Sequence, residues 1–335
     1  MSPEEVREQV RASGLLAGAG PLVAMLSGGR DSVCLLDLAV QLRGAGEPRA
    51  LHVNYGLRPE SDGDERHCRE LCERLGVALE VVRAERPTGG AGNLQAWARE
   101  LRYREARRVA RGLDPAARAR TRGGAPGEGD ELPAATRIAT GHTASDQVET
   151  ILYRLAASPG RRALLGMAPR EGRLVRPLLG LTREQTAAYC RARGLSWRED
   201  SSNEDARYAR SRVRHGLVPA LRAVHPAAEA NVLRTAQLLR AEAELLEGLL
   251  EAELRGATSI AIEHLERLPP ALARLIVMRL AEDAAGTFVP QAGARVGEIL
   301  ALARRGGRAE LHVGGLIAAV VQDGRLCMAR LPPRH

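Results

Sequence analysis

Short apolar runs alternate with amphipathic helical patterns through the first half of the chain. Four runs have the length and apolar content of buried strands, at 22–26, 49–55, 77–82 and 137–142. Apolar residues at helical spacing occupy the other stretches, at 3–18, 33–42, 61–75, 94–111 and 144–156. This alternation predicts an α/β fold with a doubly wound, mainly parallel Rossmann-like sheet, whose ligand binds at the carboxyl ends of the strands.

From about residue 180 the pattern becomes mainly helical. Helices are expected at 182–193, 205–222, 225–255, 269–285 and 290–304. A small β unit follows, with strands at 309–313, 316–322 and 325–329 and a tight turn at Asp323-Gly324.

Two interruptions in the pattern indicate how the chain divides. Gly216 and Pro219 break the helical pattern, so we expect a first domain over 1–218 and a smaller, mainly helical domain over 219–335 that ends in a β-hairpin unit. Residues 112–135 are rich in Gly, Pro, Ala and Arg and lack periodicity, which predicts a mobile surface insertion in the first domain.

The composition narrows the class of protein and of partner. The 335 residues are 44% hydrophobic and 27% charged, which is typical of a soluble protein. The net charge is +8, and all 49 basic residues are arginine, a good ligand for phosphate oxygens, although genomic base bias produces the same composition. Aromatic residues, at 2%, are too few for a base-stacking platform. No signal region or long apolar run is present, so we expect a cytoplasmic protein without a membrane segment.

A pair of glycines separates the first strand from its helix, in the string Ser27-Gly28-Gly29-Arg30-Asp31-Ser32. Glycines at such a junction let the backbone approach a ligand closely, and the following helix offers unpaired N–H groups to an anion. The serines add hydroxyl donors, whereas the carboxylate of Asp31 tolerates a phosphate only with Mg²⁺ between them. The alternative is a tight turn in which Asp31 or Ser32 caps the helix.

A second polar cluster follows the fourth strand, in the string Ala139-Thr140-Gly141-His142-Thr143-Ala144-Ser145-Asp146-Gln147-Val148-Glu149-Thr150. His142, Asp146 and Glu149 are spaced i, i+4 and i+7, so a helix that begins here places them on one face, toward the same strand ends as the glycine loop. Two carboxylates and an imidazole can hold Mg²⁺, bind an ammonium or take a proton from it. The alternative is an acidic first turn favoured by the helix dipole.

The glycine string resembles the pyrophosphate-binding loop of the PP-loop ATP pyrophosphatases, which split ATP into AMP and pyrophosphate while adenylating a substrate. It differs from a Walker loop, whose Gly-Lys-Ser/Thr ending is absent from a chain without lysine. Other strings extend the resemblance, over nearly the whole chain, to the tRNA(Ile)-lysidine synthetase family. They include His52-Val53-Asn54-Tyr55-Gly56-Leu57-Arg58, Ala98-Arg99-Glu100-Leu101-Arg102-Tyr103, Arg176-Pro177-Leu178-Leu179, Asp200-Ser201-Ser202-Asn203 and Tyr208-Ala209-Arg210-Ser211-Arg212-Val213-Arg214. The chain departs from the family pattern at Tyr55 and Thr143, where the family has histidine, and at Ser145, where it has aspartate.

The resemblance implies a two-step reaction on the wobble cytidine of tRNA(Ile) with a CAU anticodon. ATP, with Mg²⁺ at Asp31, adenylates the C2 oxygen of the cytosine, and the ε-amine of free L-lysine then displaces AMP to give lysidine. The two carboxylates, Asp146 and Glu149, would bind the lysine ammonium and remove its proton, with His142 orienting one of them. The resemblance also suggests a homodimer.

Two sets of arginines are expected to contact phosphates. Arg99 and Arg102 lie at i and i+3 and face the same way, toward the ATP phosphates or the RNA backbone. Arg207, Arg210 and Arg214 line another helical face and are expected to contact the anticodon stem. For both sets the alternative is a solvated basic surface.

Two other functions are compatible with the sequence. A different PP-loop enzyme that modifies tRNA, such as a thiolation enzyme, depends on cysteine pairs, and no Cys-x-x-Cys occurs among the five cysteines. A tRNA-binding relative with weakened catalysis is the second alternative, which the departures at Thr143 and Ser145 keep open.

Overall fold

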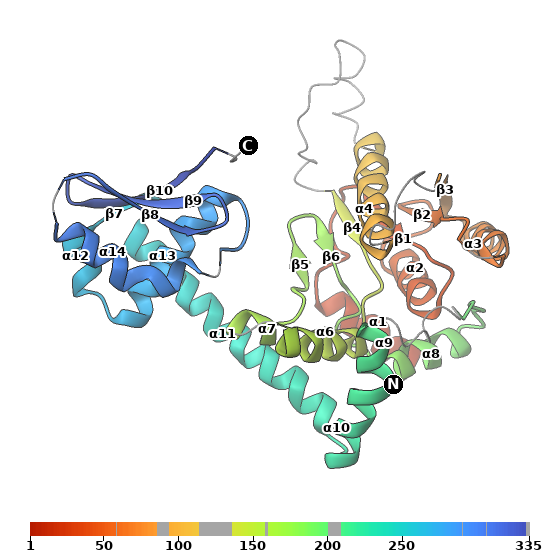
Figure 1. Ribbon diagram of the computed structural model, residues 1–335. Helices are drawn as coiled ribbons and strands as arrows, with labels where there is room; N and C mark the ends of the chain where they lie inside the picture. The colour runs from red at the N-terminus through yellow and green to blue at the C-terminus, as the bar shows by residue number, and fades with distance from the viewer. Residues whose placement is uncertain are drawn as a thin grey trace, which may run out of the picture. The chain divides into compact units, whose positions relative to one another are not determined.

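The computed structural model describes residues 1–57, 59–85, 94–113, 136–157, 160–199, 209–289, 291–305 and 307–332 (Figure 1). They form two compact units, Met1–Gln237 and Leu238–His335. None of the helices in these ranges is both long and apolar enough to cross a membrane. Most of the expected insertion lies outside the described residues, because only its first two residues belong to helix α4 (Leu94–Leu113). Arg207 also lies outside them.

A six-stranded sheet forms the centre of the first unit, in the order β3-β2-β1-β4-β6-β5. Its strands are β1 (Leu22–Met25), β2 (Pro48–Asn54), β3 (Ala78–Arg83), β4 (Arg137–Ala139), β5 (Arg170–Glu171) and β6 (Leu174–Val175). All neighbouring pairs are parallel except β5 and β6. The predicted, mainly parallel α/β sheet is therefore confirmed. The two short edge strands β5 and β6 were not predicted, because strands of two residues are too short to show an alternating pattern.

Strand β1 shows why the sheet is covered on both faces. Leu22 and Ala24 pack in one apolar cluster with α1 (Pro3–Ala12), α2 (Arg30–Arg43), α3 (Ser61–Leu75) and α8 (Arg183–Ala192). Val23 and Met25, which point the other way, pack in a second cluster with α4 (Figure 1). Because side chains alternate along a strand, a strand that is apolar throughout must be buried on both faces. The first helix ends at Ala12 rather than at 18, since Gly14 takes a φ of +65°.

A helical layer continues the first unit beyond the sheet. It contains α6 (Ala144–Ala157), α7 (Arg161–Leu164), α9 (Ala209–Arg212), the π-helix η2 (Val213–Leu217), α10 (Val218–Val224) and the start of α11 (Ala228–Leu254). Val148 and Leu152 of α6 share an apolar cluster with Val218, and Val232 and Leu233 pack against it. These contacts explain why the two units divide inside α11, between residues 237 and 238, and not at the expected 218.

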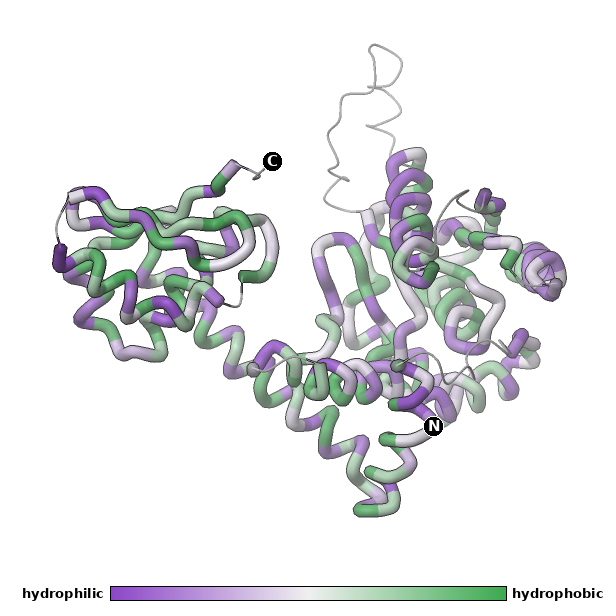
Figure 2. The backbone as a smooth tube through the Cα atoms, viewed as in Figure 1, coloured by the Kyte–Doolittle hydropathy of each residue, from purple (hydrophilic) through white to green (hydrophobic). Residues whose placement is uncertain are grey.

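The second unit packs helices on a four-stranded antiparallel sheet. The strand order is β7 (Ser259–Ala261), β10 (Arg325–Arg330), β9 (Ile317–Gln322) and β8 (Ala309–Gly314). The helices are the end of α11, α12 (Ile262–Arg267), α13 (Pro270–Ala285), the 3-10 helix η3 (Ala292–Arg295) and α14 (Val296–Ala303). The central strand β9 is buried from Ile317 to Val321, and Figure 2 shows its hydrophobic colour. The predicted β unit is thus present, extended by β7.

A buried carboxylate joins the C-terminal part of α8 to the helix that follows the glycine loop. The carboxylate of Asp37 on α2 is fully buried and accepts hydrogen bonds from the Tyr189 hydroxyl at 2.5 Å and from Arg193 Nε at 3.1 Å. Burial raises the pKa of Tyr189, and Asp37 raises it further, so the phenol remains protonated and donates. Charged acceptors need such donors when they leave water.

We expect Tyr189→Phe to destabilise the protein by about 1–3 kcal/mol, because the substitution removes one donor from a buried carboxylate and leaves the ring in place. The free energy of unfolding in urea measures the effect. Tyr153→Phe is the matched control, since Tyr153 is 46% exposed, and its effect should stay within about 0.5 kcal/mol. Equal stabilities for the two variants would show that this hydrogen bond contributes nothing.

Candidate active site

The glycine loop between β1 and α2 is closed by its own serines. The Ser32 hydroxyl donates to the carbonyl of Gly29 at 2.7 Å and accepts from the N–H of Ser27 at 3.1 Å. Gly28 takes a φ of +83°, a conformation that other residues rarely adopt. The N-cap of α2 is Gly29, and no side chain caps it. The alternative of a turn capped by Asp31 or Ser32 is therefore wrong, and the first N–H groups of α2 remain available to an anion.

The second motif lies directly against this loop. A Cβ atom on Gly141 would approach the carbonyl oxygen of Asp31 to 2.9 Å and the backbone nitrogen of Ser32 to 3.1 Å. Only a glycine allows this approach, because the neighbouring atoms belong to the backbone and cannot rotate away. Since β1 and β4 are adjacent in the sheet, the two motifs meet at the same strand ends, as the sequence predicts.

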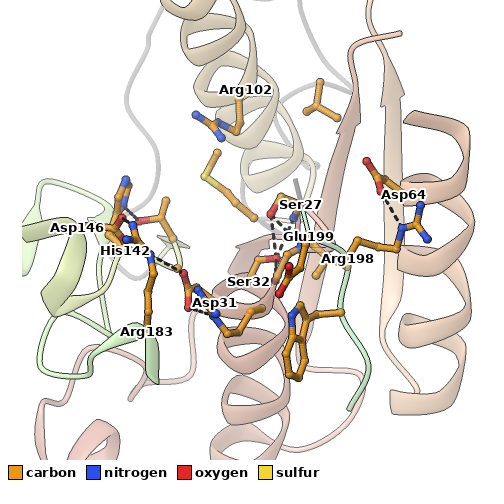
Figure 3. A pocket seen from close by; sticks show the side chains of 18 of the residues that line it. Ser27, Asp31, Ser32, Asp64, Arg102, His142, Asp146, Arg183, Arg198 and Glu199 are labelled. Carbon is orange, nitrogen blue, oxygen red and sulfur yellow. Dashed lines mark hydrogen bonds and ion pairs between the residues drawn. The ribbon is translucent and has the colours of Figure 1, made fainter. Parts of the chain in front are cut away.

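The two motifs line one cavity of about 630 Å³, a size typical of small-molecule sites. Residues 27 and 29–32 of the loop form part of its wall, together with His142 and Asp146 from the second motif. Arg102 of α4 enters from another side, and Arg183 lies between Asp31 and the second motif (Figure 3). Apolar side chains from the sheet complete the wall, among them Met25, Leu51, Val53 and Tyr55.

Asp31 is the carboxylate that the loop presents to the cavity. Its Oδ1 atom accepts a hydrogen bond from the Thr186 hydroxyl at 2.5 Å, and Arg30 Nε lies 3.4 Å away. Burial raises the pKa of Asp31, with the charge of Asp146 adding to the effect. A carboxylate beside anion-binding amides suits Mg²⁺, which takes one or two protein carboxylates and completes its shell with phosphates and water. No cluster of three or more metal-ligating side chains occurs in the described ranges.

His142 precedes α6 and does not share a helical face with the carboxylates, in contrast to the expectation. The helix begins at Ala144, where Thr143 and Asp146 make a reciprocal capping arrangement: the Thr143 N–H donates to Asp146 Oδ2 at 2.8 Å, and the Asp146 N–H donates to the Thr143 hydroxyl. The His142 Nδ1 atom instead pairs with the Thr140 hydroxyl at 2.8 Å. Burial lowers the pKa of His142 to about 4, so its imidazole is uncharged near neutral pH.

Asp146 is bound by two guanidinium groups. Its Oδ1 atom accepts from Arg183 and, at 2.8 Å, from Arg210 Nη2. Its Oδ2 atom accepts from the N–H and the hydroxyl of Thr143, each at 2.8 Å. Burial would raise the pKa of this carboxyl, but the charges of Arg210 and Arg183 outweigh burial and hold the pKa below its usual value.

Glu149 is enclosed by three guanidinium groups. Its Oε1 atom accepts from Arg183 Nη1 and from Arg214 Nε, both at 2.7 Å. Its Oε2 atom accepts from Arg210 Nε at 2.9 Å and from Arg214 Nη2 at 3.3 Å. The side chain is only 2% exposed and is not among the residues that line the cavity. Burial opposes ionisation here as well, yet these arginines keep the pKa of Glu149 lowered.

The structure therefore places Arg210 and Arg214 on the acidic pair, although they were expected on an outer helical face. The π-helix η2 contains Arg214, and the wider turn of such a segment displaces side chains from α-helical positions. An ammonium group entering the cavity meets these guanidinium groups before it meets Glu149. We call Asp146, Glu149, Arg183, Arg210 and Arg214 the charge cluster.

The two arginines expected on α4 differ in their surroundings. Arg102 lines the cavity, and its buried Nε atom has no hydrogen-bond partner among the described residues. The guanidinium carbon of Arg99 instead lies 4.8 Å from the centre of the Tyr103 ring, a cation–π contact. Arg102 is thus the one of the two that lines the cavity.

Arg183 and Arg198 are site residues that the sequence analysis missed. Arg183 is the first residue of α8, whose Thr182 cap and Gln185 form a capping box, so the sequence signals a helix start and nothing more. Its contact with Asp146 spans 37 residues of sequence. The N–H of Arg198 donates to the carbonyl of Gly28 at 2.9 Å, and its side chain pairs with Asp64 (Figure 3).

The fold and the loop together define a PP-loop nucleotide-binding protein, and a PP-loop domain family matches residues 6–117 and 132–221. The curated relatives are more specific. A tRNA(Ile)-lysidine synthase of Azoarcus sp. (strain BH72) is 35% identical over 96% of this chain and 68% of its own length. The one from Gloeobacter violaceus is 36% identical over 83% of this chain and 82% of its own, and that of Thermus thermophilus is 39% identical over 71% and 43%. The chain belongs to the tRNA(Ile)-lysidine synthase family.

A solved structure shares the fold. The U34-tRNA thiolase NcsA from Methanococcus maripaludis, solved with its [4Fe-4S] cluster, matches with a TM-score of 0.54 and 17% identity over 71% of this chain and 78% of that one. In our chain the cysteines are free, and four of the five are buried, with burial raising the pKa of Cys72 to about 12. Such thiols are poor cluster ligands, because the thiolate is the form that binds metal. The similarity is thus one of fold.

We expect Gly141→Ala to reduce nucleotide affinity at least about tenfold, because the added methyl group forces the backbone of Asp31 and Ser32 to move by an amount that costs about 1–3 kcal/mol. Equilibrium binding of an ATP analogue measures the change. Gly248→Ala, in an open position of α11, should leave affinity unchanged and stability equal or higher. Unchanged affinity in both variants would show that the contact between the motifs is not needed.

The uncharged His142 predicts a pH dependence of stability. Between about pH 6.5 and about pH 4 the unfolded chain binds a proton at this residue that the folded chain does not, so stability is lost as the pH falls through this window. We expect the free energy of unfolding to fall more steeply in the wild type than in His142→Gln, by at most about 1.4 kcal/mol per pH unit. Urea unfolding across the window measures both slopes, and equal slopes would mean that His142 titrates normally.

Proposed function

We propose that this cavity forms lysidine, by joining free L-lysine to C2 of the wobble cytidine of tRNA(Ile) with a CAU anticodon in an ATP-dependent reaction. The observation that carries the proposal is the contact of Gly141 with Asp31 and Ser32, which brings a phosphate-binding loop and the charge cluster into one cavity. The family relationship supports the same activity.

The first step we propose is adenylation. The C2 oxygen of the cytosine attacks the α-phosphorus of ATP, a C–O–P linkage forms, the α–β phosphoanhydride bond breaks, and pyrophosphate leaves. The free N–H groups at the start of α2 stabilise the charge that builds on the leaving group, as preorganised donors, while the serine hydroxyls hold the loop in shape. Asp31 would hold Mg²⁺, which neutralises phosphate charge when bound.

The second step we propose is aminolysis. The ε-amine of lysine attacks C2, the bond from C2 to the adenylated oxygen breaks, and AMP leaves with that oxygen while the nitrogen loses a proton. His142 is uncharged and lines the cavity, so it can orient the amine by hydrogen bonding, whereas its lowered pKa makes it a weak base. Asp146 and Glu149, whose oxygens are held by arginines, serve as the charged frame of the lysine site.

We also propose phosphate contacts. We assign Arg102 to the phosphates of ATP or of the anticodon loop, because the residue lines the cavity and its Nε atom has no hydrogen-bond partner in the described part of the chain. We also propose that Arg99 contacts the ATP phosphates or the RNA backbone and that Arg207 contacts the anticodon stem. A homodimer is proposed as well, and light scattering of the purified chain would test it.

The direct test is mass spectrometry of tRNA nucleosides after incubation with ATP, Mg²⁺, L-lysine and tRNA(Ile) with a CAU anticodon. Lysidine, together with AMP and pyrophosphate in equal amounts, is the expected result. Pyrophosphate release without lysine incorporation would favour another PP-loop modification. Binding of tRNA without pyrophosphate release would favour a relative that has lost catalysis.

We expect Asp31→Asn to lower the rate of pyrophosphate release by at least about 100-fold, because the amide has lost the charge that meets Mg²⁺ and the phosphates. The rate is measured with saturating ATP and tRNA over a range of Mg²⁺ concentrations. Glu73→Gln is the control, an exposed carboxylate of α3 away from the cavity, and should retain the full rate. Near-normal activity of Asp31→Asn would remove Asp31 from the metal site.

A further inference from the structure

The carboxylates of the charge cluster have no acceptor position to spare. Each oxygen of Asp146 and of Glu149 accepts two hydrogen bonds from the described residues, mostly from arginines. A carboxylate offers about four lone-pair positions in all. An ammonium group alone therefore cannot bind here unless it first displaces a guanidinium group.

The guanidinium groups, in contrast, have donors that face the cavity. Arg210 uses Nε and Nη2, and Arg214 uses the same two atoms, so the Nη1 amine of each has no acceptor among the described residues. Both residues line the cavity, and their side chains are 47% and 25% exposed. Each guanidinium has five N–H groups in a fork that matches a carboxylate. This part of the wall thus offers donors to an anion.

The charges at this end of the cavity do not favour a lone cation. Asp31, Asp146 and Glu149 supply three negative charges, and Arg30, Arg183, Arg210 and Arg214 supply four positive ones. His142, the neighbouring imidazole, is uncharged. A lone ammonium would add an uncompensated positive charge beside three guanidinium groups, which repel it. A zwitterion adds no net charge and offers a partner to both signs.

We propose that the charge cluster binds the α-amino-acid headgroup of free lysine, and not its ε-ammonium. The hydrogen bond between Arg210 and Asp146 Oδ1 breaks. Arg210 then donates to the α-carboxylate, to which Arg214 donates as well. The α-ammonium donates to Asp146 Oδ1 in place of Arg210. Every displaced hydrogen bond is thereby replaced. The proposal rests on the lysidine-forming function above and names the part of the substrate that this end of the cavity recognises.

Arg210 is the residue suited to this exchange. Its side chain is 47% exposed, whereas that of Arg183 is 16% exposed and contacts both Asp146 and Glu149. Arg183 also lies 4.0 Å from Asp31, so the cluster adjoins the phosphate loop. A headgroup held at Arg210 leaves the flexible lysine side chain free to carry the ε-amine toward the nucleotide.

Lysine analogues test the proposal on the unaltered protein. Cadaverine lacks the α-carboxylate, and Nα-acetyl-lysine lacks the α-ammonium, but both keep the attacking amine. We expect the half-saturating concentration of each to be about 10- to 100-fold above that of lysine, because each leaves a charged group of the cluster without its partner. Cadaverine that reacts as well as lysine would overturn the proposal.

The variant Arg210→Gln tests whether Arg210 binds the lysine headgroup or has another role. Its half-saturating concentration should rise about tenfold or more for lysine and remain the same for cadaverine, so that selectivity is lost. Arg191→Gln, an exposed arginine of α8, should keep the selectivity of the wild type. An equal loss for lysine and cadaverine, together with weaker tRNA binding, would show that Arg210 contacts an RNA phosphate and would overturn the assignment.

A separate readout distinguishes this inference from the proposed function. Pyrophosphate release from ATP and tRNA in a single turnover without lysine reports adenylation alone, and the wild type and the Arg191→Gln control should release it at the same rate. Absence of release in the wild type would contradict the proposed function itself. Normal release combined with no preference for lysine over cadaverine would contradict only the headgroup site.

Discussion

The close approach of Gly141 to the backbone of Asp31 and Ser32 is the constraint on which the site depends. Gly141 has no side chain that could rotate away, so the chain after β4 and the start of α2 lie at a fixed separation. The helices around them maintain this geometry: α8 is tied to α2 through the buried carboxylate of Asp37, and Thr186 and Arg183 of the same helix reach Asp31. A phosphate loop can act as a preorganised set of donors only if its frame does not relax.

The buried charges of the cavity are paired. Asp146 lines the cavity and Glu149 does not, and burial, which alone would raise the pKa values of both carboxyls, is outweighed by the guanidinium groups that bind them. The same burial lowers the pKa of His142 and keeps it uncharged, because its Nδ1 atom pairs with a neutral hydroxyl and the more distant charge of Asp146 does not compensate. One cavity therefore combines the N–H groups at the start of α2, an uncharged imidazole and a set of paired charges. A chain without lysine adds no lysine side chain of its own that could compete with the substrate.

Much of the fold follows from local patterns. Strand β1 is apolar throughout because both faces of the sheet are covered, and helix α3 begins and ends where the pattern and Gly76 predict. A boundary that depends on distant contacts differs from the local pattern: the compact units divide inside α11, because its start packs on α6. The short strands β5 and β6 were also not predicted, because a strand of two residues shows no periodic pattern of apolar and polar residues.

The features of the site also fall into two groups, those that the local sequence specifies and those that only the folded chain creates. The string from Ser27 to Ser32 specifies a phosphate loop, because its glycines, serines and helix start act within six consecutive residues. The environment of Asp146 and Glu149 is different in kind: it depends on Arg183, Arg210 and Arg214, which are 34 to 65 positions away along the chain. Local chemistry can be predicted from the sequence because residues that are neighbours in the chain are also neighbours in space. The partners of a buried charge are chosen by packing, and only the folded chain brings them together.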